Sequence, residues 1–380
     1  MRRIVLATDA AFFPPFQGDS ARLLQLIQFL KRRGWGVHVV HFHDRQQRDV
    51  DYVEMSRLVD QLVVYFPSDD DLELRKSERL DDWCPERFAL LVRSVCNSAN
   101  ADAVVAQFVF LSRCLSLIDA SSGVCRILDA DNIFAGRREK HAAAGVPYAW
   151  FSTTETEERE GWRRADLLMS VQEHELDVIR RTVPRRPVIL VPYAQKVTDT
   201  GPGNGQSLLF VGADNEANVA GLQAFVAEAL PELRRRHAAA RLVIAGRAGE
   251  RFRDTPGVEA RGVVEDLGDC YSAAPIAINV MTCGTGLKTK TIEALCHGKC
   301  LVSTPAGVEG LEQYPEVYHV AETPRALGGI IGDLFDRPDE IERTRMAALW
   351  FARGYFAADV VFGRLETAIV NWLERNRPVE

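Results

Sequence analysis

The segment from Cys283 to Lys299, CGTGLKTKTIEALCHGK, places glycines and lysines directly before an apolar helix. Gly284 and Gly286 lack a Cβ atom, so the backbone there can approach a ligand closely. Lys288 and Lys290 add positive charge at the first helical turn, where unpaired N–H groups and the helix dipole already attract anions. Without an anion, lysines at this position cost up to about 1 kcal/mol. The segment therefore predicts a binding site for phosphate.

Glu293 lies five residues after Lys288, more than one turn deeper in the same predicted helix. Its carboxylate can accept hydrogen bonds from two neighbouring hydroxyls, such as those of a ribose. Taken singly, each of these residues also fits an ordinary surface lysine or a carboxylate that caps a nearby loop. Taken together, a phosphate site and a diol site on one helix favour a nucleotide ligand.

The elements that must position these residues begin with an apolar run, RRIVLATD, a loop rich in proline and the helical pattern ARLLQLIQFLKRRG. A second apolar run, GVHVVHF, completes a βαβ unit, which implies parallel strands and a right-handed crossover. Further strands are predicted at residues 60–66, 101–108, 124–131 and 165–171. A segment rich in glycine and threonine, residues 196–206, then interrupts the pattern and is the predicted linker.

The pattern starts again at residue 207, with strands predicted at 207–213, 240–246, 257–264, 275–281 and 299–305. One long helix is predicted at 216–237, and the Lys288 helix lies between the last two strands. The prediction is an α/β fold of two Rossmann-like domains with parallel sheets, and the cleft between them is the expected site. The expected organisation is an N-terminal acceptor-binding domain at 1–195, a donor domain at 207–350 and a C-terminal helix at 351–380 that returns toward the first domain.

Composition limits the class of protein. The 380 residues carry a formal charge of −7, which argues against a general nucleic-acid binder. Eight cysteines without a CxxC pair indicate reduced thiols, and the N-terminal run lacks the length and cleavage site of a signal peptide. No run reaches the roughly 20 apolar residues that span a bilayer. We expect a soluble, cytoplasmic protein, and a peripheral contact at the inner membrane face stays open.

The segment GTGLKTKTIEALCHGKCLVSTPAGVEGL resembles the donor-binding signature of GT-B glycosyltransferases, especially glycosyltransferase family 4, the glycosyl transferases group 1. The positions that match the signature are Gly284, Gly286, Lys288, Lys290, Glu293, Ala294, Gly298, Gly307, Glu309 and Gly310. Residues 210–247 resemble the start of the same domain, and residues 15–40 match a weaker pattern in the first domain. The resemblance implies GT-B architecture, with two Rossmann-like domains facing across a central cleft and C-terminal helices packing back across the junction.

The resemblance further implies a hexosyltransferase that moves a sugar from a nucleotide-diphosphate sugar to an unidentified acceptor, with retention of configuration. Lys288 and Arg247 would hold the diphosphate and stabilise the charge that develops during transfer. Glu293 would bind the ribose, and the nucleobase would lie near Gly212 and Gly246. The remaining donor contacts that the resemblance implies are Gly18 from the first domain and Gly284, Thr285, Gly286 and Leu287 from the signature.

Several positions depart from the family pattern. Thr285 stands where many members carry a second glutamate that touches the donor sugar, and Gln17 replaces the first glycine of an N-terminal pair. Asp131 stands where many members have a histidine beside that sugar, although Asn132 matches a frequent neighbour. The identity of the sugar therefore does not follow from the resemblance. Asp131 is the best polar candidate near the sugar, and no catalytic base is assigned.

A metal ion is an alternative holder of the diphosphate. Asp129 and Asp131 form a DxD pattern, by which another glycosyltransferase fold binds a divalent metal. In this chain lysines already supply the charge, so the favoured interpretation has Asp129 capping the following helix and Asp131 facing the cleft. Cys296, His297 and Cys300 lack a second half for a metal site. We predict no metal and no cofactor beyond the sugar nucleotide.

The acceptor is open among small molecules, glycans and lipid-linked sugars, and so is the oligomeric state. Basic clusters near Arg137, Arg163 and Arg180 fit an anionic acceptor, lipid head groups or simply solvated helix faces. Three other functions remain: a nucleotide-sugar epimerase of the same fold, an NAD-dependent oxidoreductase and a catalytically inactive nucleotide-binding homologue. The oxidoreductase is disfavoured, because no G-x-G-x-x-G motif follows the first strand of this chain.

Overall fold

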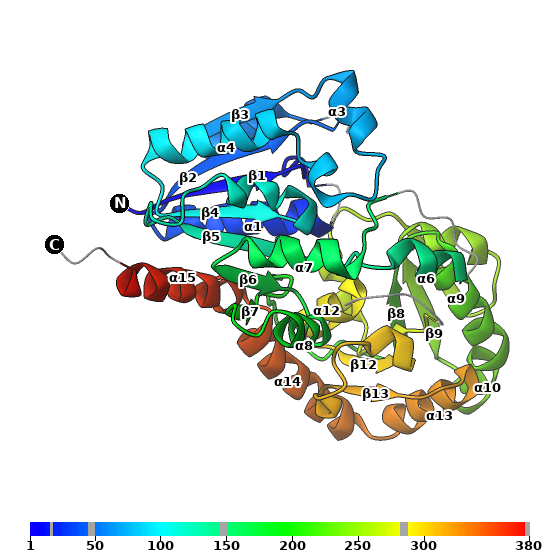
Figure 1. The fold of residues 1–380 in the computed structure, drawn as a ribbon. Helices are drawn as coiled ribbons and strands as arrows, with labels where there is room; N and C mark the ends of the chain where they lie inside the picture. The colour runs from blue at the N-terminus through cyan, green and yellow to red at the C-terminus, as the bar shows by residue number, and fades with distance from the viewer. Residues whose placement is uncertain (16–17, 45–49, 144–149, 282–287, 377–380) are drawn as a thin grey trace. The chain divides into compact units, whose positions relative to one another are not determined.

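The computed structural model describes the whole chain except residues 16–17, 45–49, 144–149, 282–287 and 377–380. The chain forms two compact units (Figure 1). The first unit consists of Met1–Ala194 together with Val361–Glu380, and the second of Gln195–Val360. Each unit is built around one parallel β-sheet, so the predicted α/β architecture with two parallel sheets is confirmed.

The first unit contains a seven-stranded sheet in the order β3-β2-β1-β4-β5-β6-β7. Neighbouring strands run parallel, as in the pairing of Ile4 with Val37 and with Ala103. Ile4, Val5 and Leu6 are almost completely buried, as expected for a parallel sheet covered on both faces. Its strands are β1 (Arg3–Thr8), β2 (Gly36–Phe42), β3 (Gln61–Tyr65), β4 (Ala103–Gln107), β5 (Cys125–Ala130), β6 (Leu167–Ser170) and β7 (Val188–Leu190).

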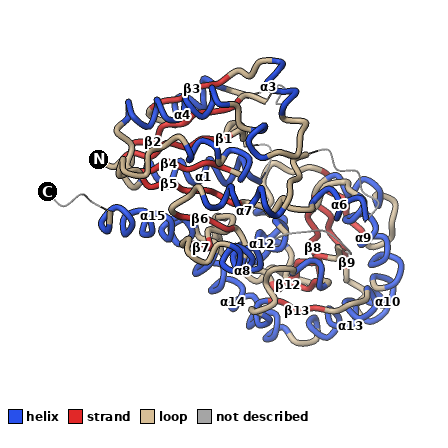
Figure 2. The backbone as a smooth tube through the Cα atoms, viewed as in Figure 1, coloured by secondary structure: helices blue, strands red, loops and turns tan. Residues whose placement is uncertain are grey.

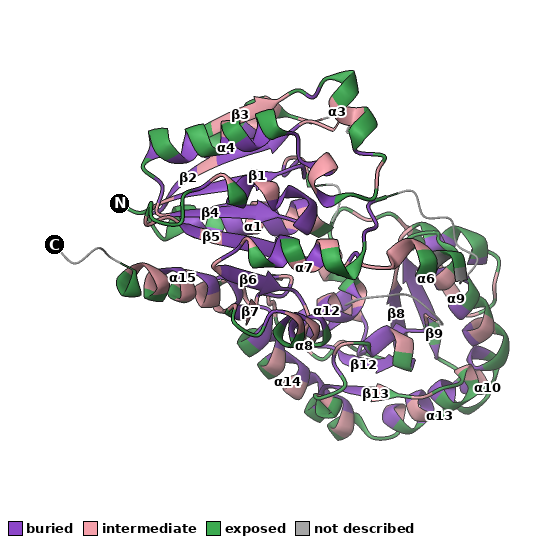
Figure 3. Ribbon diagram, viewed as in Figure 1, coloured by how far each residue is buried: buried purple, intermediate pink, exposed green. Residues whose placement is uncertain are grey.

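Helices connect these strands and flank the sheet (Figure 2). They are α1 (Gly18–Arg32), α2 (Tyr52–Leu58), α3 (Asp69–Leu74), α4 (Glu86–Ala99), α5 (Arg113–Ser116), α6 (Arg137–Ala143), α7 (Glu155–Arg163) and α8 (Glu173–Thr182), with short 3₁₀ helices η1 (Leu80–Trp83) and η2 (Val109–Leu111). In α1 and α4 the buried residues recur at helical spacing, so one stripe of each helix packs on the sheet while its other face meets solvent (Figure 3).

The second unit contains a six-stranded sheet in the order β10-β9-β8-β11-β12-β13. Its strands are β8 (Ser207–Val211), β9 (Arg241–Ala245), β10 (Val258–Gly262), β11 (Ile276–Asn279), β12 (Cys300–Ser303) and β13 (Tyr318–Val320). Its helices are α9 (Glu216–Glu228), α10 (Leu230–Arg236), α11 (Gly268–Ala273), α12 (Thr289–Cys296), α13 (Pro324–Phe335) and α14 (Pro338–Tyr355), with 3₁₀ helices η3 (Arg247–Phe252), η4 (Pro305–Val308) and η5 (Pro315–Val317).

One predicted helix is divided in two. The segment 216–237 forms α9 and α10, which meet at Ala229, instead of one continuous helix. Pro231 lies in the first turn of α10, where its missing N–H is tolerated; inside a continuous helix it would remove a hydrogen bond and clash with the preceding turn. The hydrophobic periodicity continues through the break, which is why it suggested a single element.

The chain returns to the first unit in its last helix, α15 (Ala358–Arg375). Phe362 is fully buried and its ring lies 5.7 Å from that of Phe29 in α1. Glu366 accepts hydrogen bonds from the indole of Trp35 and the guanidinium of Arg33, at 3.0 and 2.8 Å. Full burial of one large apolar side chain contributes about 1.5–3 kcal/mol, so Phe362 is a main anchor of α15.

Candidate active site

The strand order of the second sheet identifies where a ligand would bind. From β8 the chain moves outward through β9 and β10, then crosses back to β11 and continues outward through β12 and β13. The two directions diverge between β8 and β11, and ligands of open parallel sheets bind at the carboxyl ends of the strands beside such a switch point. The segment after β11 leads into α12, so the predicted phosphate-binding helix starts at this edge.

Helix α9 packs directly onto the segment that follows β11. A Cβ atom on Gly221 would lie only 1.8 Å from the carbonyl oxygen of Val280, so no other residue fits without movement. Helix α9 follows β8, and the Val280 segment follows β11, so this contact joins the elements that flank the switch point. The backbone around the candidate site is therefore held at a fixed spacing.

Lys288 occupies the N-cap position of α12 and is 7% exposed. A lysine side chain has no hydrogen-bond acceptor, so it cannot cap the first-turn N–H groups as serine or aspartate would. Its ammonium lies 2.9 Å from a carboxylate oxygen of Glu309. The helix start thus combines backbone donors with one buried full positive charge, the arrangement expected of a phosphate site.

Lys290 does not share this role. Its ammonium donates to the side-chain oxygen of Asn218 in α9 and lies 4.6 Å from the centre of the Phe210 ring. Burial, and after it the charge of Lys288, lower the pKa of Lys290 to about 8. The sequence suggested that both lysines add charge at the helix start, but Lys290 is turned toward the interior and ties α12 to α9.

Glu293 faces a tyrosine on a neighbouring helix. The hydroxyl of Tyr271, in α11, donates to the Glu293 carboxylate at 3.3 Å, and the Tyr271 ring stacks on His297 with 4.2 Å between ring centres. Burial raises the pKa of the Glu293 carboxyl, while the Tyr271 hydrogen bond opposes the rise. A partly buried carboxylate with one oriented donor keeps acceptor capacity for further hydroxyl groups.

The structure brings the two glycines predicted near the nucleobase together. Gly212 follows β8 and Gly246 follows β9, and the Gly212 N–H donates to the carbonyl of Ala245 at 2.9 Å. Gly246 has φ +105°, and a Cβ atom there would lie 2.2 Å from the Gly212 carbonyl oxygen. Arg247 is exposed at the first position of η3, directly after this pair. These positions share the carboxyl edge of β8 and β9.

Four predicted donor contacts, Gly284, Thr285, Gly286 and Leu287, lie outside the described residues. The same holds for Gln17, next to Gly18 in the first unit. Gly18 itself is the first residue of α1, and a Cβ atom there would lie 3.2 Å from the ring of Tyr193. The roles assigned to these residues by resemblance stay predictions.

Asp131 follows β5 in the first unit and is 2% exposed. The Tyr193 hydroxyl lies 3.3 Å from both of its carboxylate oxygens. Burial raises the pKa of Asp131 to about 7; Arg22 opposes this rise, and Asp129 and Asp19 add to it. A carboxyl group in this pKa range can hold or release a proton near neutral pH, which suits a group next to a reacting sugar.

Asp129 does not cap a helix, in contrast to the favoured interpretation of the sequence. Its carboxylate pairs with the guanidinium of Arg22, which reaches across from α1 and also donates to the Val191 carbonyl at 3.0 Å. Asp131 is buried as well, and its expected place in a cleft stays a prediction. The strand order explains the ion pair, because α1 follows β1 and the carboxyl end of β5 lies two strands away in the same sheet.

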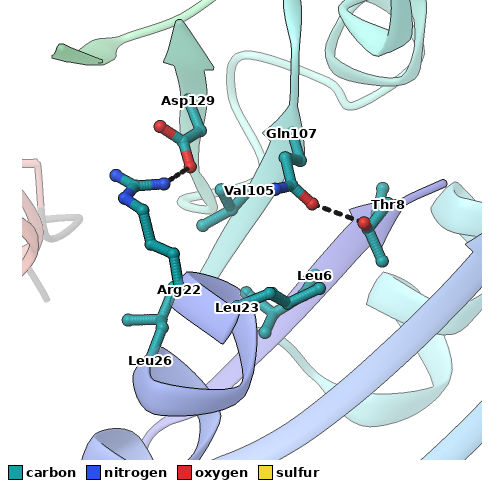
Figure 4. Close-up of a pocket in the computed structure, with 9 residues that line it drawn as sticks. Leu6, Thr8, Arg22, Leu23, Leu26, Val105, Gln107 and Asp129 are labelled. Carbon is teal, nitrogen blue, oxygen red and sulfur yellow. Dashed lines mark hydrogen bonds and ion pairs between the residues drawn. The ribbon is translucent and has the colours of Figure 1, made fainter. Parts of the chain in front are cut away.

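A small cavity adjoins this ion pair (Figure 4). Its volume is about 10 Å³, near the lower limit for one water molecule. The Gln107 side chain accepts from the Thr8 hydroxyl and turns its amide nitrogen toward the side of the cavity where Arg22 and Asp129 meet (Figure 4). Two buried polar pairs, Thr8–Gln107 and Arg22–Asp129, thus lie at the carboxyl ends of β1, β4 and β5.

Sequence reasoning missed the partners of the predicted residues. Glu309, Tyr271 and Tyr193 contact Lys288, Glu293 and Asp131, respectively. Glu309 had a signal, because it falls on the later part of the family signature, but no role followed from that position. In the described part of the chain, no three or more His, Cys, Asp or Glu side chains gather so as to hold a metal ion.

Part of the chain matches a known protein family. Residues 205–336, which cover most of the second unit, match the family model described as Glycosyl transferases group 1. No curated protein sequence gives a significant match. Among the described residues, every helix is too short or too polar to span a bilayer.

Solved structures resemble the chain over nearly its whole length. A glycosyltransferase from Rickettsia africae has a TM-score of 0.68 at 11% identity, covering 98% of this chain and 99% of that one. A sucrose-phosphate synthase from Thermosynechococcus elongatus has 0.67 at 14%, covering 99% and 100%. The pneumococcal O-GlcNAc transferase in complex with UDP and GlcNAc has 0.66 at 10%, covering 98% and 99%. At these identities the similarity shows the fold, which is the GT-B fold.

Proposed function

We propose that this chain, a glycosyltransferase with a glycosyl transferases group 1 domain at residues 205–336, moves a sugar from a nucleotide-diphosphate sugar to an acceptor bound by the first unit, with retention of configuration. The single observation that carries the proposal is the buried ammonium of Lys288 at the start of α12, beside the switch point of the second sheet. An ammonium and first-turn N–H groups together match a diphosphate.

The chemistry follows from where charge develops. When the bond between sugar and diphosphate breaks, negative charge builds on the leaving diphosphate. A positive group already in place stabilises this charge more strongly than it stabilises the bound donor, and this difference accelerates the reaction. Lys288 is suited to this role because its ammonium is held by burial and by Glu309. We assign Arg247, exposed after β9, to the same diphosphate.

The nucleoside half of the donor is assigned to neighbouring positions of the second unit. Glu293 would accept hydrogen bonds from the ribose hydroxyls, supported by its partly buried carboxylate and its orienting contact with Tyr271. The nucleobase would lie near the backbone of Gly212 and Gly246, which meet at the carboxyl ends of β8 and β9. UDP is the nucleotide in the pneumococcal structure, so uridine nucleotides are the first to test.

The remaining assignments carry over from the resemblance. Asp131 is proposed as the polar group toward the reacting sugar, supported by its raised pKa, and Gly18 as a backbone contact of the donor. We propose that Lys288, rather than a divalent metal, neutralises the diphosphate, so turnover should survive EDTA. We also propose a cytoplasmic location with a peripheral contact to anionic lipid. Arg163 and Arg180 pair with Glu160 and Asp177 on their own helices, which offsets part of the positive charge that they offer to lipid. Sedimentation with anionic vesicles would test whether the contact forms.

A thermal-shift screen against UDP-, GDP-, ADP- and dTDP-sugars tests the proposed function. A donor at 100 times its dissociation constant should stabilise the protein by about 2.7 kcal/mol. Incubation of the stabilising donor with pooled glycan acceptors should then give a transfer product, whose anomeric configuration NMR would read. A sugar nucleotide altered without an acceptor would identify an epimerase instead. Binding without any product would identify an inactive homologue, and no binding would refute the proposal.

A further inference from the structure

The Lys288 ammonium, proposed above to bind the diphosphate, is already bound to an anion of the protein itself. The Glu309 carboxylate lies 2.9 Å from it. The two partners differ sharply in exposure, since the side chain of Lys288 is 6% exposed and that of Glu309 is 48% exposed. The lysine is fixed by its surroundings, whereas the glutamate reaches in from solvent.

The backbone that carries Glu309 is tied to the start of α12. The Thr304 hydroxyl accepts from the Gly307 N–H at 3.2 Å, and the Gly307 carbonyl accepts from the side chains of Thr291 and Asn279, at 2.6 and 3.2 Å. A Cβ atom on Gly307 would lie 2.2 Å from the Ser303 hydroxyl, so this turn is closely packed. Because Thr291 lies in the first turn of α12, the turn and the helix start form one body.

Glu309 can therefore change position by turning its side chain while the Gly307 turn stays in place. A diphosphate bound to Lys288 would bring a second anion next to the carboxylate. Two anions this close repel each other, so the carboxylate must leave the ammonium. Half exposure lets it turn outward with little loss of packing. In a sugar nucleotide the sugar is attached to the outer phosphate, so a carboxylate displaced from that phosphate is within reach of the sugar hydroxyls, which are hydrogen-bond donors.

We propose that Glu309 is a specificity-determining residue that exchanges Lys288 for the hydroxyl groups of the transferred sugar when the donor binds. This inference rests on the proposed function and adds to it a preference for the intact donor over the nucleoside diphosphate. An intact donor compensates the displaced carboxylate with sugar hydroxyls, whereas a nucleoside diphosphate alone does not. After transfer the sugar is gone, Glu309 returns to Lys288, and the diphosphate product is expelled.

An ion pair with a purely structural role would behave differently. It would contribute to stability, and its removal would change the affinity for diphosphate and for intact donor by the same factor, because both ligands carry the same phosphates. The ratio of the two dissociation constants therefore separates the proposals. Stability alone does not, because both predict a small loss.

The experiment measures dissociation constants for UDP and for the stabilising UDP-sugar by calorimetry, with the full chain and its variants. If the screen selects another nucleotide, its diphosphate and sugar nucleotide replace these. In Glu309→Gln, which keeps the shape but removes the charge, UDP should bind about five- to tenfold tighter, while the intact donor should change less than threefold. Glu309→Asp, which keeps the charge, should retain most of the preference for the donor. Glu316→Gln removes a charge from an exposed position of the same unit and is the matched control.

Each outcome decides a separate point. An unchanged ratio of the two constants in Glu309→Gln, with UDP and donor both still binding, would overturn the role of Glu309 and leave the proposed function intact. Failure of the parent protein to bind either ligand would refute the proposed function, and this inference with it. If circular dichroism shows that Glu309→Gln is misfolded, Glu309→Asp and Glu309→Ser replace it. The same ratio of the two dissociation constants in the parent and in Glu309→Asp, together with tighter UDP binding in Glu309→Ser, would still support the inference.

Discussion

The carboxyl edges of the two sheets hold their charges in opposite ways. In the first unit, Arg22 and Asp129 form an ion pair whose side chains are 2% and 4% exposed, and their neighbours Gln107 and Asp131 are buried with them. In the second unit, Lys288 is equally buried, but its partner Glu309 is 48% exposed. The first arrangement is closed to solvent on both sides, and the second is closed on only one side.

The exposure of the partner group determines which charges can be exchanged for a ligand. Separating a fully buried pair leaves each charge without water or partner, and the cost of desolvation keeps the pair together. In a pair with one exposed partner, water can take up the displaced carboxylate, and an incoming anion can replace it on the buried ammonium, so the exchange leaves no buried charge unpaired. By this reasoning the first edge fixes geometry, while the second edge can bind an external anion. Variants at the two edges test this contrast.

Asp129→Ala should reduce the free energy of unfolding by about 3–5 kcal/mol, because it leaves the Arg22 guanidinium buried without its carboxylate. Urea unfolding followed by tryptophan fluorescence would measure this, since Trp83 and Trp162 are buried in the first unit. Glu309→Ala should cost less in the same assay, because the carboxylate that it removes is already half exposed to solvent. Similar losses in the two variants would break the contrast between the edges.

Lys288→Ala should lower kcat/KM by roughly 100-fold, or about 3 kcal/mol, because it removes a positive group that stabilises the leaving diphosphate. The measurement is initial transfer rate with the identified donor, and circular dichroism checks that the fold is kept. Arg325→Ala, which removes an exposed charge from α13 of the same unit, is the control and should leave the rate unchanged. Transfer by Lys288→Ala at the parent rate would show that the phosphate is bound elsewhere.

Asp131→Asn should change how stability depends on pH. Burial raises the pKa of Asp131 to about 7 in the folded protein, whereas in the unfolded chain the pKa stays near 3.8, the ordinary value of an aspartate. Between these values the folded state holds a proton that the unfolded state has lost, so stability falls as pH rises from about 4 to about 7. Removing this group should make the decrease in the free energy of unfolding between pH 5 and pH 7 smaller by about 2 kcal/mol.

Urea unfolding at pH 5, 6 and 7 would measure this slope. Burial also raises the pKa of Glu175 to about 7, so Asp131→Asn should keep part of the decrease and Glu175→Gln should remove another part. Equal slopes in the parent and Asp131→Asn would mean that Asp131 is ionised throughout this pH range. It would then resemble the exposed carboxylates of the second unit, and the first edge would not be closed to solvent.

Much of the fold was predictable because its signals are local. Apolar runs separated by helical patterns predicted two parallel sheets, and glycines and lysines before an apolar helix predicted where α12 begins. The boundary between α9 and α10 was missed because periodicity outweighed Pro231, although a proline inside a predicted helix is itself a break signal. The order of the strands has no local signal.

The site was predictable only in part, for a related reason. Lys288 and Glu293 were found from their places along one helix, but their partners are distant in sequence; Glu309 lies 21 residues from Lys288, and Asp129 lies 107 from Arg22. Such pairs meet only once the sheet is assembled. The inward turn of Lys290 was within reach of the sequence, because residues two apart near a helix start point to nearly opposite sides of the helix.

Tyr271→Phe tests whether the carboxyl edge of the second sheet binds the hydroxyl groups of a ribose as well as a phosphate. The variant removes the hydroxyl that donates to Glu293 at 3.3 Å but keeps the ring stacked on His297. If Glu293 binds the ribose, a less oriented carboxylate should weaken UDP binding by about fivefold, or about 1 kcal/mol. The affinity for 2′-deoxy-UDP should fall less, because that ligand offers one hydroxyl fewer. Calorimetry with both nucleotides on both proteins gives the comparison. Equal weakening of the two would place the ribose away from Glu293, and the second edge would then be a phosphate site only.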